Sequence, residues 1–111
     1  MPKNYTMVVL TNPVEGREDA FNRWYTDVHI HDVIKTPGFR SARRFKAADS
    51  ADGEAPKYRY FASYEVETDD LPAVLQDLSA RYGTDDMVAT DTMQEDVLAF
   101  AYEAITPLVS K

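Results

Sequence analysis

The 111-residue chain contains no cysteine, only four glycines and no long uninterrupted apolar run. The absence of cysteine excludes disulfides, thiolate metal sites and a cysteine nucleophile. The glycines are scattered singly, so neither the GxGxxG motif of dinucleotide-binding proteins nor a phosphate-binding P-loop is present. The opening stretch MPKNYTMVVLTNP has too short an apolar run for a signal peptide or a membrane span, and it predicts a first strand. We therefore expect a cytoplasmic protein that does not bind membranes.

Basic residues are also in the minority, with 12 Lys and Arg against 19 Asp and Glu, giving a net charge of -7. Binding to a phosphate backbone requires a basic face that displaces counterions, so the composition disfavours nucleic-acid binding. Hydrophobic residues make up 44% of the chain, with seven Tyr, five Phe and one Trp, which is typical of a packed globule. Residues 1–111 are expected to form a single domain.

Changes in hydrophobic period divide the chain into strands and helices. The pattern predicts strands at 5–12, 39–48, 58–67 and 97–108, helices at 14–36 and 69–83, an exposed loop at 49–57 and an undecided segment at 84–96. Pro37-Gly38 should end the first helix, and Asp70 and Gly83 should bound the second. The order β-α-β-β-α-β predicts an α+β, ferredoxin-like antiparallel sheet with both helices on one face.

The strands do not alternate apolar and polar residues cleanly, although an antiparallel sheet with one solvated face should do so. In the third strand Tyr60 and Tyr64 share one face while Phe61 lies on the other, and in the last strand Phe100 opposes a row of small apolar residues. Two helices cover one face only. We therefore expect a second copy to cover the other face, giving a homodimer packed sheet to sheet as a dimeric α+β barrel.

The stretch NRWYTDVHIHDVIKTPGF, residues 22–39, concentrates chemically active side chains. At about 100° per residue, one arc of the helix has His29 at its border and collects Phe21, Tyr25, Val28 and Asp32. A carboxylate in a core-facing position is costly unless it is paired, and Asp32 lies within reach of His29. Such a pair would fix the imidazole tautomer and raise its basicity, as a general base near neutral pH requires.

A structural role is the alternative for these residues. Asp32 could bind backbone amides or an arginine, and His29 could be half exposed, because satisfied histidines are commoner than catalytic bases. His31 points about 160° away from His29 on a helical wheel. Since residues two apart do not share a helical face, a metal site built from His29, His31 and Asp32 is not expected.

Arginines on the second strand supply candidate partners. Regular alternation places Arg40 and Arg44 on one face and Arg43 on the other, together with Phe39. An arginine on the helix-facing side would pair with Asp32 or with an anionic group of a substrate. Alternation alone does not decide which face that is.

Tyrosines on the third strand supply phenols to one face of the sheet, through Tyr58, Tyr60 and Tyr64. Cross-strand aromatic ladders also stabilise sheets without any ligand, so a purely structural role is the alternative. Trp24 is interpreted most simply as a core or interface residue.

Two consecutive motifs resemble a known family. W-Y-x-x-x-H-x-x-D followed by P-G-F-x-x-A-x-R-F is similar to the EthD-like branch of the dimeric α+β barrel superfamily, and the matching positions are Trp24, Tyr25, His29, Asp32, Pro37, Gly38, Phe39, Ala42, Arg44 and Phe45. The second half of the chain resembles the family only in element order and in the closing Y-x-x-x-x-P pattern, Tyr102 to Pro107. The family often has a proline after the histidine, where this chain has His31, so a role for His31 stays open.

The resemblance implies a pocket between the sheet and the helices and a helix-borne histidine acting as acid or base, which favours His29 and Asp32. Members of the superfamily share the fold but include cofactor-free monooxygenases, polyketide cyclases, lactone isomerases, dehydratases, haem enzymes and auxiliary proteins. The resemblance therefore predicts the fold but does not select one reaction.

We expect a cofactor-independent enzyme of the lyase, isomerase or cyclase type acting on a small aromatic or polyketide-like substrate. The expected catalytic residues are His29, Asp32 and Tyr25, and the expected substrate contacts are Tyr60, Arg44, Trp24 and His31, with no metal and no cofactor. Three alternatives remain: a non-catalytic dimeric protein that binds a hydrophobic metabolite, a cofactor-free monooxygenase, and a haem-binding relative with His29 as axial ligand.

Overall fold

The computed structural model covers residues 1–111 and has the predicted order of strands and helices. The strands are β1 (Lys3–Thr11), β2 (Phe39–Lys46), β3 (Tyr60–Thr68) and β4 (Leu98–Glu103). The helical segments are α1 (Glu18–Trp24), η1 (Tyr25–His29), α2 (Ile30–Ile34) and α3 (Leu71–Arg81). All strand pairs are antiparallel, in the order β2-β3-β1-β4. The predicted ferredoxin-like α+β fold is confirmed.

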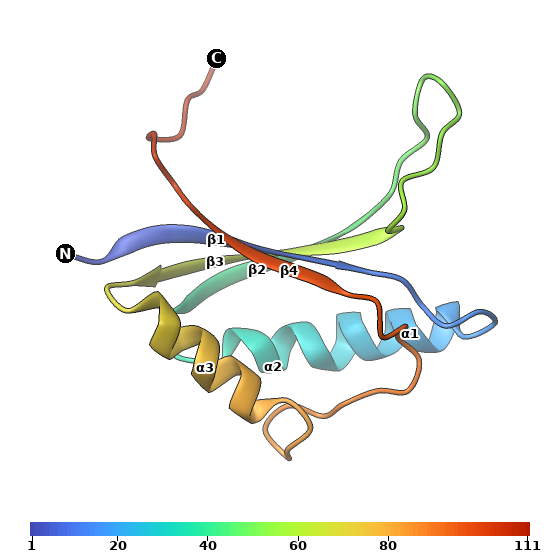
Figure 1. Ribbon diagram of the computed structural model, residues 1–111, viewed down its shortest axis with the longest axis horizontal. Helices are drawn as coiled ribbons and strands as arrows, with labels where there is room; N and C mark the ends of the chain where they lie inside the picture. Colours follow the sequence, from blue (N-terminus) through green and yellow to red (C-terminus); the bar gives the residue numbers. More distant parts are fainter.

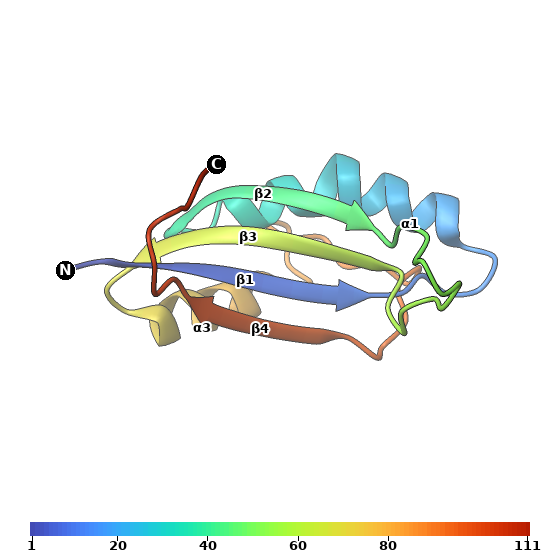
Figure 2. The same cartoon turned by 90° about the horizontal axis from the view of Figure 1, so that it is seen from above.

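The helices form a single layer on one side of the sheet (Figure 1). The helix-facing side chains of the two central strands are buried, among them Met7 on β1 and Tyr64 on β3, which are direct neighbours in the register. The opposite face of the sheet is open, as Figure 2 shows from above. No helix in the structure combines the length and the hydrophobicity that crossing a membrane would require.

The first helix is longer than its individual segments, because α1, η1 and α2 follow one another with helical backbone angles at both junctions. Its middle part is a π-turn, in which the backbone N–H of Ile30 donates to the carbonyl oxygen of Tyr25, five residues back. Such wide turns are rare and occur mostly inside α-helices at functional sites. The regular spacing assumed for residues 14–36 therefore fails within this helix.

A β-bulge interrupts β2 near its start. Phe39 pairs with Val66 and Ser41 pairs with Glu65, so Arg40 is an extra residue in the ladder. Phe39 is consequently buried on the helix-facing side, while Arg40 forms a 2.9 Å ion pair with Glu67. The prediction that Arg40 shares a face with Arg44 is wrong, because sequence alternation cannot reveal the bulge.

The remaining boundaries follow local signals. The Asp70 side chain caps α3 by accepting a hydrogen bond of 3.2 Å from the backbone N–H of Ala73, as predicted. Gly83 follows the helix with a positive φ of 85°. The segment 84–96 forms only isolated bridges, and β4 ends at Glu103, earlier than the predicted residue 108.

Gly38 connects the first helix to β2 with φ at 98°, a region that favours glycine. A Cβ atom at this position would lie 3.0 Å from Cγ2 of Val74 on α3. We expect Gly38→Ala to lower the free energy of unfolding by about 1–3 kcal/mol, measured by urea denaturation. Gly53→Ala is the matched control, because Gly53 also has a positive φ but a Cβ there meets no atom within 4 Å. Equal losses in the two variants would contradict a role for the Val74 contact.

Candidate active site

A cavity of about 440 Å³ lies between the sheet and the helices, within the size range of small-molecule sites. Its walls are formed by β1, β3, the first helix, α3, the segment after α3 and the start of β4. Eleven of its 13 lining residues are hydrophobic, and the complete lining is Met7, Val9, Tyr25, His29, Val33, Tyr64, Leu78, Ser79, Tyr82, Met87, Met93, Val97 and Ala99. An apolar cavity with a few converging polar groups is the expected form of a site for a small organic ligand.

The π-turn decides which helical residues reach this cavity. The buried residues of the first helix are spaced four apart, at Phe21, Tyr25, His29 and Val33. A regular α-helix would rotate the later positions away from the sheet, and the wide turn compensates for that rotation. His29 therefore lies within the buried stripe instead of at its border, and Val28, predicted to face inward, is 38% exposed.

His29 is buried among aromatic rings. Its ring stacks on Trp24 with 4.4 Å between centroids and meets Tyr25 edge-on at 4.8 Å. Neither ring nitrogen has a hydrogen-bond partner within the protein, and Nδ1 is fully buried. Burial lowers the pKa of His29 from 6.5 to about 4, so the imidazole is neutral at physiological pH.

Asp32 does not hold His29 as the sequence suggested. Its carboxylate lies 3.8 Å from Nζ of Lys35, and the structure contains no hydrogen bond or ion pair between Asp32 and His29. The charge of Asp32 raises the pKa of His29 through space, but burial outweighs this effect. The cause lies in the π-turn, which places His29 and Val33 in the buried stripe and leaves Asp32 beside it, with its side chain 15% exposed.

Two phenols face the cavity beside His29. The hydroxyl oxygens of Tyr25 and Tyr64 are 2.9 Å apart and hydrogen-bonded. Burial is the main cause that raises the pKa of both tyrosines, so both keep their protons at neutral pH. One of the two hydroxyl protons forms the bond between them, and the other has no acceptor within the protein.

The four expected substrate contacts do not line the cavity. Arg44 and Tyr60 are on the helix-facing side of the sheet but lie behind Tyr25. The Trp24 ring stacks on the ring of His29, and its Nε1 donates a hydrogen bond to the carbonyl oxygen of Val88 at 3.0 Å. His31 is exposed.

Other lining residues were not among the expected site residues. Tyr64 was recognisable as part of the phenolic face of its strand, because it alternates with Tyr60. Tyr82 lies at the end of the predicted helix 69–83, and Met87 and Met93 lie in the segment 84–96, where no hydrophobic period gave a signal.

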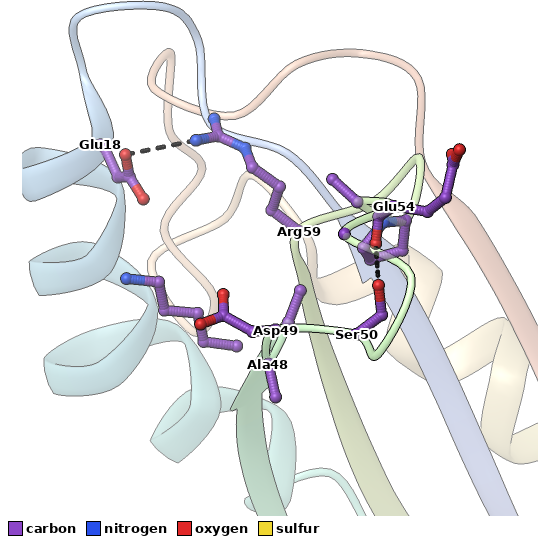
Figure 3. Close-up of a pocket in the computed structure, with 11 residues that line it drawn as sticks. Glu18, Ala48, Asp49, Ser50, Glu54 and Arg59 are labelled. Carbon is purple, nitrogen blue, oxygen red and sulfur yellow. Dashed lines mark hydrogen bonds and ion pairs between the residues drawn. The ribbon is translucent and has the colours of Figure 1, made fainter.

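A second hollow of about 400 Å³ lies between the start of α1 and the loop joining β2 to β3 (Figure 3). Only three of its 11 lining residues are hydrophobic, and two of its charged groups, Arg59 and Glu18, form an ion pair at 3.4 Å. Neither hollow contains three or more His, Asp or Glu side chains arranged to hold a metal ion. The apolar cavity is therefore the better candidate for an organic ligand.

Comparisons with solved structures support the fold assignment. A protein from Shewanella loihica PV-4, provisionally named a monooxygenase, is 13% identical, and the match covers 96% of this chain and 99% of that one with a TM-score of 0.64. An ethyl tert-butyl ether degradation (EthD) family protein from Bacillus halodurans C-125 is 17% identical, covers 93% and 99% of the two chains, and has a TM-score of 0.53. The EthD-like resemblance is thus confirmed at the level of the fold.

Sequence comparison adds a family without adding a function. No curated protein sequence shows significant similarity to the chain. A family model described as a domain of unknown function, DUF4286, matches residues 6–101, which is most of the chain. The protein therefore belongs to the DUF4286 family.

Proposed function

We propose that the protein is a cofactor-independent enzyme that moves a proton on a small aromatic or polyketide-like substrate, as a lyase, isomerase or cyclase. The observation that carries this proposal is the convergence of an unpartnered neutral imidazole and a hydrogen-bonded tyrosine pair on one apolar cavity. His29 would accept the proton, and the free hydroxyl proton of the Tyr25–Tyr64 pair would bind the oxygen on which negative charge develops.

The low pKa of His29 restricts the substrate. A base is most effective when its pKa is near the operating pH, and a pKa of about 4 in the empty site makes His29 a weak base. When the substrate loses its proton, the new anion lies beside the imidazolium and stabilises it in a low-dielectric cavity. The fitting substrates carry an acidic proton, such as the C–H between two carbonyl groups or a phenolic O–H.

A deuterium-exchange screen tests this function. Cyclic and linear 1,3-diketones and 2-hydroxyaryl ketones would be incubated with the protein in D₂O, and C–H exchange would be followed by NMR against buffer alone. Thermal stabilisation measured in parallel reports binding. We expect at least one compound both to bind and to exchange faster than in buffer. Binding without acceleration across the panel would favour the non-catalytic alternative, a protein that sequesters a hydrophobic metabolite.

Proton removal from a phenol is also the first step of a cofactor-free oxidation by oxygen. The provisional name of the S. loihica protein refers to this class of activity. Oxygen consumption with bound phenols, measured with an oxygen electrode, separates this candidate from lyase or isomerase chemistry, which consumes no oxygen.

We further propose that the enzyme works as a homodimer joined through the open face of the sheet. Large apolar side chains gather on that face, namely Val8, Leu10, Phe45, Phe61, Leu98, Phe100 and Tyr102. Four of them are at least 37% exposed, and such a patch is typical of an interface. The C-terminal tail and the β2–β3 loop both rise on this side at opposite ends of the sheet (Figure 1), so they would flank a second sheet packed on this face.

The dimer proposal predicts a mass in solution of about twice 12.6 kDa at low micromolar concentration, measured by light scattering. Phe100→Glu should shift the protein to the monomer, because a charge in an apolar sheet interface is costly. Val88→Glu is the matched control, since Val88 is 50% exposed against 51% for Phe100 but lies outside the sheet. A monomeric wild-type protein would contradict the proposal.

A further inference from the structure

The guanidinium of Arg44 is a half-buried positive charge that contacts three aromatic rings and has no carboxylate partner. Its Cζ lies 4.5 Å from the ring centroid of Tyr25, 5.2 Å from Tyr60 and 5.3 Å from Phe21. Nη1 donates only to neutral oxygens, Oδ1 of Asn22 at 3.0 Å and Oγ1 of Thr26 at 2.9 Å. Nη2 is buried and has no partner. Because a guanidinium stays protonated in proteins, an uncompensated charge persists at this place.

This charge lies directly behind the cavity wall. The Tyr25 ring has the guanidinium against it, and its hydroxyl oxygen bonds Tyr64 at the cavity. Contact of a cation with an aromatic ring is worth about 0.5–2 kcal/mol, so three rings offset part of the cost of burying the charge. They do not cancel its field, which reaches both hydroxyl groups and lowers their pKa against the effect of burial.

Neighbouring acidic groups do not cancel the field either. Glu18 accepts a hydrogen bond from the hydroxyl group of Tyr60 and forms an ion pair with Arg59 at 3.4 Å. It does not line the cavity. Asp32, the acid whose charge acts on His29, is paired with Lys35. His29, which lines the cavity, is neutral at neutral pH. Arg44 is therefore the cation whose charge acts on both tyrosine hydroxyls, although the whole chain carries -7.

We propose that Arg44 is a positioning residue whose fixed charge makes the cavity select ligands that bind as oxyanions, either phenolates or the enolates of 1,3-dicarbonyl compounds. The anionic oxygen of the ligand accepts a hydrogen bond from the free hydroxyl of the Tyr25–Tyr64 pair. Arg44 does not contact this oxygen, and its charge acts on the oxygen across the Tyr25 ring. The proton lost by the ligand passes to His29 or to water, and no oxidant or reductant is needed. This inference rests on the proposed function and names its substrate class.

The test uses 4-nitrophenol, whose phenolate is yellow, so that the pKa of the bound phenol can be measured by visible absorbance. We expect the wild-type protein to lower that pKa by about one unit relative to free 4-nitrophenol, as a single charge behind one layer of side chains would. Arg44→Met should abolish the lowering, and Arg44→Lys should restore part of it because the charge returns. Arg23→Met is the matched control, since Arg23 is exposed on α1 and does not line the cavity.

A comparison within the wild-type protein keeps the test decisive if Arg44→Met fails to fold. At pH 8 the protein should bind 4-nitrophenolate at least about tenfold more tightly than its neutral methyl ether, 4-nitroanisole. Equal affinity for the two compounds, or an equal lowering of the phenol pKa in wild type and Arg44→Met, overturns the role of Arg44 and leaves the proposed function standing. Binding of neither compound contradicts the proposed function as well.

Discussion

Replacing His29 by alanine is expected to slow C–H exchange of a bound 1,3-diketone by about 10²–10⁴-fold, the usual contribution of a positioned general base. Ligand affinity should change by only a few-fold, because most of the cavity lining is apolar and remains in place. The rate is measured by NMR in D₂O and the affinity by calorimetry. A variant that exchanges the ligand as fast as the wild type would remove His29 from the mechanism.

The second histidine provides the control for this experiment. His31 is two residues away on the same helix but exposed, so His31→Ala should leave both rate and affinity unchanged. The pH profile adds an independent check. Because the pKa of His29 in the free protein is about 4, the rate should stay constant down to about pH 5 and fall only as the imidazole becomes protonated.

The same imidazole should make the protein sensitive to acid. In the folded protein the pKa of His29 is about 4, whereas an unfolded histidine titrates near 6.5. Between these values the unfolded chain binds a proton that the folded chain excludes, so stability rises with pH across this window. Above pH 6.5 the free energy of unfolding is free of this penalty. As the pH falls to about 4, the free energy of unfolding decreases by about 3 kcal/mol through His29 alone.

Urea denaturation at a fixed protein concentration between pH 4 and 8 measures this loss. The variant His29→Leu should lose less stability than the wild type between pH 6.5 and 4, because its buried side chain does not titrate. Carboxylates contribute to both curves equally and cancel in the difference. His31→Leu should follow the wild type. Parallel curves for the wild type and His29→Leu would show that His29 is not buried in its neutral form.

Sequence reasoning located the elements and the main chemical groups because these depend on local signals. The caps of α3, the strand order and the inward position of Tyr25 follow from residue type and period. Two irregularities escaped it, and each adds a single residue to a repeating unit. The π-turn puts His29 and Val33 in the buried stripe in place of Val28 and Asp32, and the bulge after Phe39 separates Arg40 from Arg44. A count of regular spacings from the sequence contains neither insertion.

The partnership of Arg44 could not be predicted either. An arginine on a strand beside an acidic helix suggests an ion pair with Asp32, yet its guanidinium contacts rings and amide or hydroxyl oxygens. This arrangement depends on the rotation of the helix about its own axis, which the π-turn alters. The helical wheel assumed a regular helix, and the ion pair between Arg44 and Asp32 that was expected from it does not form.

The two walls of the cavity differ in regularity. His29, Tyr25 and Tyr64 lie on a helix and a central strand, whereas Met87 and Met93 belong to the segment 84–96, which forms neither a helix nor a strand. Under the proposed function, the groups for proton transfer are held by regular structure, and the irregular segment contributes to the shape of the space that a ligand would fill. Substitutions in this one segment would then change which ligand fits and leave the imidazole and the two phenols in place.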